Sequence, residues 1–329
     1  MESGDDDRVS ALPDGVREHL LSFLPAHEAV RTTVLARSWR NLWRRSPALR
    51  VTQWGSLAKF TQFVETFPRL RLSTTDEAAS PVPLDFCHFD FGVTYNSGEP
   101  CMLVDEARLT LTASRHLTMF ELDGVEIRNN LNLSGFPALK DLIIRFCGIY
   151  AEEIRAPYLK HLTMDNCFFR AVRRLTLRLP SVVSLELKDY EGLAPFLPSM
   201  PSLETALVST YSDSSEADRC YLSSIDGCGD EDCHGCGDYY LSNIDPTSCV
   251  LLGGLYEATS LELAVCPEMI VFIKDLKYAQ TFGKLKTLVL ADWFVAADLR
   301  ALIWFLNHSP MLEKLTLKVS EVSILNALV

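Results

Sequence analysis

The sequence has no uncharged apolar run long enough to cross a membrane, and its first residues, MESGDDDR, lack the basic and apolar regions of a secretory signal. We therefore expect a chain located in the cytoplasm and/or nucleus, with no membrane partner. Disulfides are rare in those compartments, so the 10 cysteines are expected to be mostly reduced thiols. Basic residues are also in deficit, because 31 Lys and Arg against 43 Asp and Glu leave a net charge of −12. This balance argues against binding of nucleic acid through phosphate contacts.

Catalytic motifs are missing as well. The sequence contains no Gly-x-Ser-x-Gly elbow, no phosphate-binding Gly-Lys-Ser/Thr loop and no His-Glu-x-x-His. Among the 7 histidines, only His234 lies between two cysteines, Cys233 and Cys236. Their acidic surroundings raise a thiol pKa, whereas a cysteine nucleophile needs a lowered one. We therefore expect a binding protein and not an enzyme.

Hydrophobic residues make up 48% of the 329 residues and charged residues 22%, which are ordinary values for a folded chain. At this length we expect either two units or one elongated repeat array.

Three short helices are predicted between residues 8 and 49. Pro13 and Pro25 each suit the first turn of a helix, where the missing proline N–H costs nothing. From spacing alone, the apolar faces also fit a helical cap packed on the chain's own core. Those faces are formed by Val16, Leu20, Phe23 and Leu24, by Ala29, Val30 and Val34, and by Trp39, Leu42 and Trp43.

Five stretches of this segment carry a family resemblance: Leu12-Pro13-Asp14, Leu20 to Pro25, Glu28 to Thr32, Val34 to Arg37 and Trp39 to Trp43. They resemble an F-box, the helical module that docks onto a Skp-family adaptor in cullin-based ubiquitin ligases. The likeness is strongest to plant F-box proteins with leucine-rich repeats. It implies adaptor contacts from Leu12, Pro13, Val16, Leu20, Leu21, Leu24, Pro25, Val30, Val34, Leu35, Trp39, Leu42 and Trp43.

Arg17 and Glu18 depart from the resemblance, because the family commonly has leucines at these positions. Two interpretations stay open. The charges either weaken adaptor binding or lie on a solvated flank of the first helix.

Repeats indicate the architecture of the rest of the chain. The pattern Leu-x-x-Leu-x-Leu-x-x-Cys-x-Leu begins at Leu139 and Leu159 in its best copies. The starts are mostly about 20 to 27 residues apart, as in leucine-rich repeats. Stacked repeats bury a core that no single repeat can bury alone, so we predict an α/β fold: a three-helix F-box followed by a leucine-rich-repeat solenoid with a curved parallel sheet. Looser copies begin at Leu117, Val182, Leu203, Ala258, Leu285 and Leu312.

The predicted organisation is an F-box at 8–50, a linker helix and first irregular repeat at 51–100, and leucine-rich repeats at 101–329. Helices are expected at about 56–67 and 294–306, and a strand at 84–93. Cysteines at the ninth repeat position, Cys147, Cys167 and Cys266, are expected to be buried structural thiols. No cap is evident at the C-terminus, which is consistent with a short isoform or a truncated gene product.

An acidic, cysteine-rich insert is predicted at about 211–245. Its cysteines, Cys220, Cys228, Cys233 and Cys236, are a weak candidate zinc site, because a second Cys-x-x-Cys pair is missing. The Asp, Ser and Gly content favours a disordered loop over 212–239 without metal.

The resemblance implies a substrate-recognition subunit of an SCF-type E3 ligase, whose F-box holds the adaptor and, through it, a cullin. The alternative is a repeat scaffold or truncated isoform that binds a protein target without joining a ligase. An inositol polyphosphate needs a dense basic cluster that we do not find, so no cofactor is expected. The target surface is expected on the concave face, at Asp141, Ile143, Arg145, His161, Thr163, Asp165, Ser184, Glu186, Lys188, Ser260, Glu262, Thr287, Val289, Lys314, Thr316 and Lys318.

Overall fold

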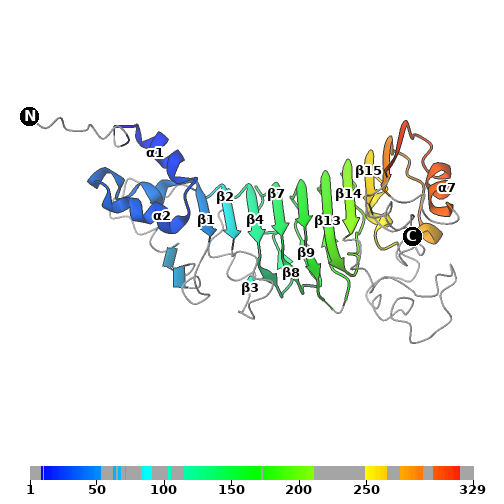
Figure 1. The fold of residues 1–329 in the computed structure, drawn as a ribbon, viewed down its shortest axis with the longest axis horizontal. Helices are drawn as coiled ribbons and strands as arrows, with labels where there is room; N and C mark the ends of the chain where they lie inside the picture. The colour runs from blue at the N-terminus through cyan, green and yellow to red at the C-terminus, as the bar shows by residue number, and fades with distance from the viewer. Residues whose placement is uncertain are drawn as a thin grey trace, which may run out of the picture.

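A small helical module leads into a long solenoid of parallel strands (Figure 1). The computed structural model describes residues 9, 11–52, 62–63, 66–67, 71, 83–90, 103–104, 115–171, 173–210, 249–264, 275–291 and 299–318. In these ranges, every helix is too short or too polar to span a bilayer.

The helical module begins with α1 (Asp14–Leu21) and α2 (Ala26–Arg31), each directly preceded by a proline as predicted. The third predicted helix is wrong in type, because its residues form the 3₁₀ turns η2 (Arg37–Trp39) and η3 (Leu42–Arg45). Ala36 is extended before η2, and Asn41 separates the two turns, so no continuous α-helix forms. Another 3₁₀ turn, η1 (Thr32–Val34), continues α2.

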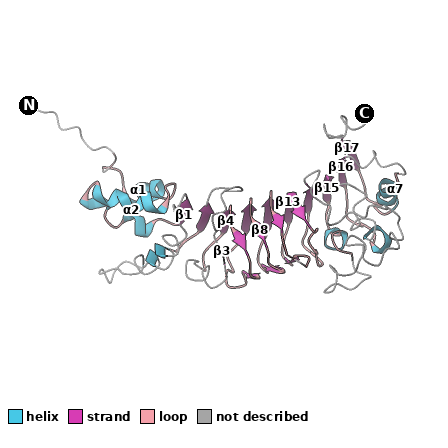
Figure 2. Cartoon of the chain, turned by 60° about the horizontal axis from the view of Figure 1, so that its bottom comes forward, coloured by secondary structure: helices cyan, strands magenta, loops and turns pink. Residues whose placement is uncertain are grey.

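Parallel strands stack in register along the solenoid, and the row of long strands follows a shallow arc (Figure 2). The long strands are β1 (Ala48–Thr52), β2 (Phe86–Asp90), β4 (Met119–Asp123), β7 (Asp141–Arg145), β10 (His161–Asp165), β13 (Ser184–Gly192), β14 (Thr205–Thr210), β15 (Ser260–Ala264), β16 (Thr287–Ala291) and β17 (Lys314–Lys318). A second row pairs β3 (Leu103–Val104), β5 (Glu126–Ile127), β8 (Gly148–Ile149), β11 (Phe168–Phe169) and the end of β13. A third, 3-stranded sheet consists of β6 (Leu131–Asn132), β9 (Glu153–Arg155) and β12 (Thr176–Arg178).

The leucines of the repeats form the core of these stacked strands, which confirms the predicted solenoid. Leu142, Leu162 and Leu185 are register partners on adjacent strands, and all are buried. The two described ninth-position cysteines are buried as predicted. The thiol of Cys147 donates to the carbonyl oxygen of Arg145 at 3.0 Å, and that of Cys167 to Ile144 at 3.4 Å. The thiol at the ninth repeat position therefore donates a hydrogen bond to a backbone carbonyl where the chain leaves a strand.

The helical module and the solenoid share one core. Leu21, Trp39 and Trp43 belong to the same cluster of buried residues as the repeat leucines. Arg50 on β1 also donates from Nε to the carbonyl oxygen of Ser22 in the module at 3.0 Å. β1 falls partly inside the range predicted for the F-box, so the parallel sheet begins earlier than the repeats seen in the sequence.

Other predicted elements are described in part. The strand predicted at 84–93 is β2. Residues 62–63 and 66–67 of the helix predicted at 56–67 are helical. The helix predicted at 294–306 is described as α7 (Arg300–Asn307), and a short helix, α5 (Leu252–Leu255), follows the insert. The insert at 211–245, the end of the chain beyond residue 318 and Cys266 lie outside the described residues.

Candidate functional site

A row of large apolar side chains lies exposed on α1 and just after its end. Val16, Leu20 and Phe23 are 45%, 43% and 61% exposed, and they follow the helical spacing of one face. The resemblance predicts adaptor contacts from Val16 and Leu20, and the structure leaves both side chains exposed while it turns Leu21 and Arg17 inward. A small helical module in water gains nothing from presenting such a row, unless a partner covers it.

Two further apolar side chains are exposed at the end of η1. Val34 and Leu35 are the most exposed large hydrophobic residues of the described chain, at 84% and 67%. With Val16, Leu20 and Phe23 they make up what we call the exposed apolar set of the module.

The structure divides the residues predicted to contact an adaptor. Leu21, Trp39, Leu42 and Trp43 are buried and support the module's fold, so a partner cannot reach them in this conformation. Pro13 is exposed. Leu12, Leu24, Pro25 and Val30 are half-buried.

Arg17 and Glu18 do not form a solvated flank. Arg17 is buried, forms an ion pair with Asp14, and places its guanidinium carbon 5.6 Å from the ring centroid of Trp39. The carboxylate of Glu18 is largely buried and lies 2.9 Å from Nε of Arg45. Arg17 and Glu18 therefore each form an ion pair within the module.

The predicted target-contacting residues lie together on one face of the long strands, which we call the sheet face. They alternate with the buried leucines and form three rows across the strands. The first row is Ala48, Phe86, Met119, Asp141, His161, Ser184, Thr205, Ser260, Thr287 and Lys314. The second row is Arg50, His88, Glu121, Ile143, Thr163, Glu186, Leu207, Glu262, Val289 and Thr316. The third row contains Thr52, Asp90, Asp123, Arg145, Asp165 and Lys188, and at the far end Ala291 and Lys318.

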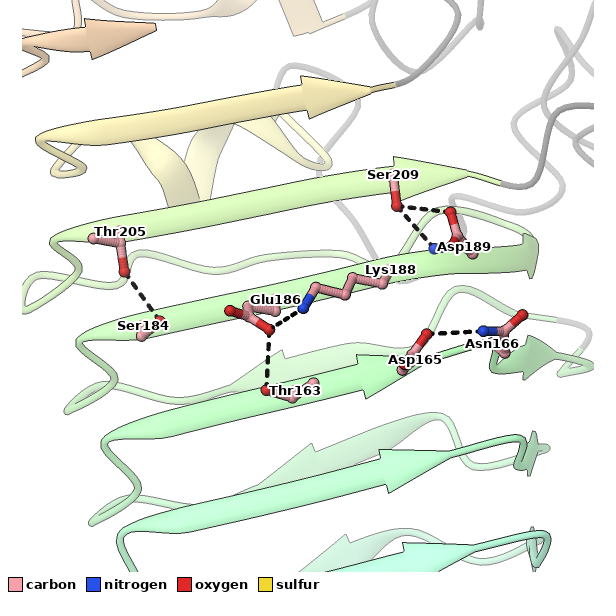
Figure 3. Close-up of polar contacts among 9 residues, drawn as sticks. All are labelled: Thr163, Asp165, Asn166, Ser184, Glu186, Lys188, Asp189, Thr205 and Ser209. Carbon is pink, nitrogen blue, oxygen red and sulfur yellow. Dashed lines mark hydrogen bonds and ion pairs between the residues drawn. The ribbon is translucent and has the colours of Figure 1, made fainter. Parts of the chain in front are cut away.

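Polar side chains in the middle of the sheet face bind one another. Glu186 lies 2.6 Å from Nζ of Lys188, and it accepts a hydrogen bond of 3.4 Å from the Thr163 hydroxyl (Figure 3). Thr205 donates to Ser184 at 3.0 Å. Further along, Lys318 reaches Glu262 at 2.5 Å across the intervening strand β16. The charges from β13 onward are thus largely satisfied within the face.

Sequence reasoning missed the first part of the sheet face. His88 and Asp90 on β2, and Glu121 and Asp123 on β4, stand in the same rows as the predicted residues. The signal was available, because residues 84–93 alternate and a loose repeat copy begins at Leu117. With these side chains included, the face is not evenly mixed in charge, since its β2 to β7 end carries an excess of carboxylates.

The described thiols and carboxylates show no metal-binding arrangement. The described residues contain no group of three His, Cys, Asp or Glu placed to hold a metal ion. Burial raises the pKa of Cys167 to about 12, which leaves an inert thiol. Cys220, Cys228, Cys233 and Cys236, the weak zinc candidates, lie outside the described residues.

Comparison with known proteins finds plant relatives. An F-box/LRR-repeat protein of Arabidopsis thaliana is 60% identical over 45 residues, which are 14% of this chain and 9% of the relative. A putative F-box/LRR-repeat protein of the same plant is 25% identical over 345 aligned residues, covering 96% of this chain and 72% of that relative. Another is 28% identical over 180 residues, covering 49% of this chain and 39% of the relative. The match thus spans less than half the length of two of these three. No family model matches. No solved structure matches either.

Proposed function

We propose that the chain is a plant F-box/leucine-rich-repeat protein that acts as the substrate-recognition subunit of an SCF-type E3 ubiquitin ligase. In this proposal the helical module docks on a Skp-family adaptor, and through it on a cullin. The sheet face holds the protein target.

One observation carries the proposal: the exposed apolar row of Val16, Leu20 and Phe23 on a module that otherwise has a well-buried core. Burying apolar surface is the main favourable contribution to protein association, at about 25 cal/mol per Å². The tryptophans that give the module its family likeness, Trp39 and Trp43, belong to that buried core.

Ubiquitin transfer in such a complex is the work of partner subunits. This chain contributes by holding the target near a charged carrier, which makes an otherwise bimolecular step effectively intramolecular. No residue of the chain is assigned a catalytic role.

Binding of the full chain to a purified Skp-family adaptor tests the proposal. We expect a stable complex at micromolar concentrations. A chain that captures a protein target and does not bind the adaptor would instead act as a repeat scaffold outside any ligase.

A further inference from the structure

The last described strand of the solenoid, β17, contains no buried residue, whereas every other long strand does. Its Leu315 and Leu317 are the register partners of Leu288 and Leu290 on β16. The two β16 leucines are 0% exposed, but Leu315 and Leu317 are 36% and 43% exposed. Positions that form the core in the preceding repeat are therefore open to water at this strand.

An open end of this kind is unfavourable for two reasons. Exposed leucines forgo the stabilisation that burial of apolar surface supplies. Among the described strands, β17 also pairs only with β16, so its outer edge presents backbone N–H and C=O groups that can pair with a further segment. A solenoid in water is normally covered at its ends.

A second copy of the chain fits this edge poorly. In a two-fold pairing of β17 with itself about Thr316, Lys314 of one copy would lie opposite Lys318 of the other. Like charges directly opposite each other on adjacent strands are destabilising. The charges of β17 therefore favour an occupant that is apolar and carries no cation.

The segment that follows β17, residues 319–329, has this chemistry. Glu321 is its one charged residue, and the sign is opposite to that of Lys314 and Lys318. These 11 residues can span up to about 36 Å, against about 17 Å for the length of β17, so the segment can reach every part of the strand. Its apolar residues are Val319, Val322, Ile324, Leu325, Ala327, Leu328 and Val329.

We propose that residues 319–329 fold back over β17 and cover Leu315 and Leu317. Their apolar side chains take the place that the leucines of a following strand hold elsewhere in the solenoid. The proposal does not depend on the adaptor or the target, because β17 lies at the end of the molecule opposite the helical module (Figure 2). It implies that the edge of β17 is closed to partner proteins.

Hydrogen–deuterium exchange of the full chain tests the proposal. The test variant is Ile324→Asp with Leu325→Asp, which replaces two neighbouring apolar residues of the segment. The matched control is Ser320→Asp with Ser323→Asp, which adds the same charge to the same segment and keeps its apolar residues. The exchange rate of the β17 backbone amides is measured, with the amides of β7 in the middle of the solenoid as an internal reference.

We expect the β17 amides to exchange at least ~tenfold faster in the test variant than in wild type, because an uncovered edge opens more easily. The control variant should differ from wild type by less than about twofold, and β7 should not change in either variant. Unchanged exchange at β17 in the test variant would overturn the proposal. Equal acceleration in the control, or at β7, would overturn it too, since added charge or the stability of the whole chain would then explain the effect.

Sedimentation at several protein concentrations identifies the occupant. We expect wild type and the control variant to stay monomeric, and the test variant to self-associate through its uncovered edge. A wild-type chain whose β17 amides are protected only in a dimer would assign the cover to a second copy and contradict the proposal. All three proteins should bind the adaptor equally, so failure of this proposal is distinguishable from failure of the proposed function.

Discussion

Arg17 on α1 and Trp39 on η2 form a buried cation–aromatic pair, with 5.6 Å between the guanidinium carbon and the ring centroid. Asp14 supplies the counter-charge. Two guanidinium nitrogens of Arg17, Nε and Nη1, are buried without a hydrogen-bond partner. Such a group is costly to bury, because lost hydration of a cation is only partly replaced by one carboxylate and one ring.

Replacing Arg17 by leucine should therefore leave the module as stable as before or stabilise it by up to ~1 kcal/mol, because leucine has a similar volume and the partner Asp14 is 56% exposed and stays hydrated without the arginine. Urea unfolding measures the difference, with Arg17→Ala as the variant that leaves a cavity. A loss of more than ~1 kcal/mol in Arg17→Leu would show that the charge stabilises the module. Adaptor affinity should not change, because Arg17 faces inward.

Trp43 is predicted to act on adaptor binding only through folding. Its ring packs 5.8 Å from that of Phe67 within the core. Truncating a buried aromatic to alanine typically costs ~3 to 5 kcal/mol. Trp43→Ala should lower the melting temperature and lose the adaptor together. A Trp43→Ala protein that melts like wild type and still fails to bind would place this ring at the interface.

A substitution of Gly192, at the end of β13, tests the packing of the solenoid. Its φ is +101°, and an added Cβ would lie 2.2 Å from the carbonyl oxygen of Phe169. Gly192→Ala should destabilise the chain by more than ~1 kcal/mol, because both the backbone conformation and the space exclude a side chain. Gly135→Ala is the matched control, since nothing lies within 4 Å of its added Cβ. Equal unfolding midpoints for the two variants would contradict this packing.

Asp275 should make stability depend on pH. It accepts hydrogen bonds from the backbone N–H groups of Val250, Leu251 and Leu252, at 2.6, 2.8 and 2.7 Å. Burial nevertheless raises its pKa from 3.8 to about 6, against those bonds and the charge of Arg174. The folded state therefore binds the proton more tightly than the unfolded state.

Because the folded pKa is the higher one, this carboxyl group makes the chain less stable as pH rises from about 4 to 6, and adds no slope above that. Asp275→Asn cannot titrate, so the stability difference between wild type and variant should change by roughly 2 to 3 kcal/mol across the window. Unfolding free energies at several pH values measure it. Parallel pH curves for the two proteins would refute the assignment to Asp275.

The solenoid was predictable because its buried apolar residues recur at regular intervals in the sequence. Leu139, Leu142 and Ile144 are buried at the spacing that one repeat requires, and the next copy repeats it in register. The strand β2 was predicted from its alternation, but β1 was not, because its buried positions, such as Val51, do not repeat the leucine pattern. The acidic side chains of β2 and β4 were missed although both strands had a signal in the sequence.

The orientation of α1 was not predictable from spacing. Periodicity identified the apolar row of Val16 and Leu20, but a helix in a water-exposed module and a helix packed on its own core have the same pattern. What distinguishes them is which neighbours cover the row. The buried Arg17 on the opposite side gave no signal of its own, because a charged residue normally indicates the solvent face.

Adaptor affinity of the full chain with a single charge placed in the exposed apolar row is the measurement that tests the proposed function most directly. Leu20→Asp changes a side chain that is 43% exposed on α1, whereas Leu306→Asp makes the same change at a 47% exposed position on α7, at the other end of the molecule (Figure 1). We predict micromolar or tighter binding of a Skp-family adaptor by wild type and by Leu306→Asp. Leu20→Asp should melt like wild type and bind at least ~30-fold more weakly, as expected when an interface anchor worth ~2 kcal/mol is lost. Absence of binding by wild type, or equal binding by both variants, would contradict the assignment of the helical module to an adaptor.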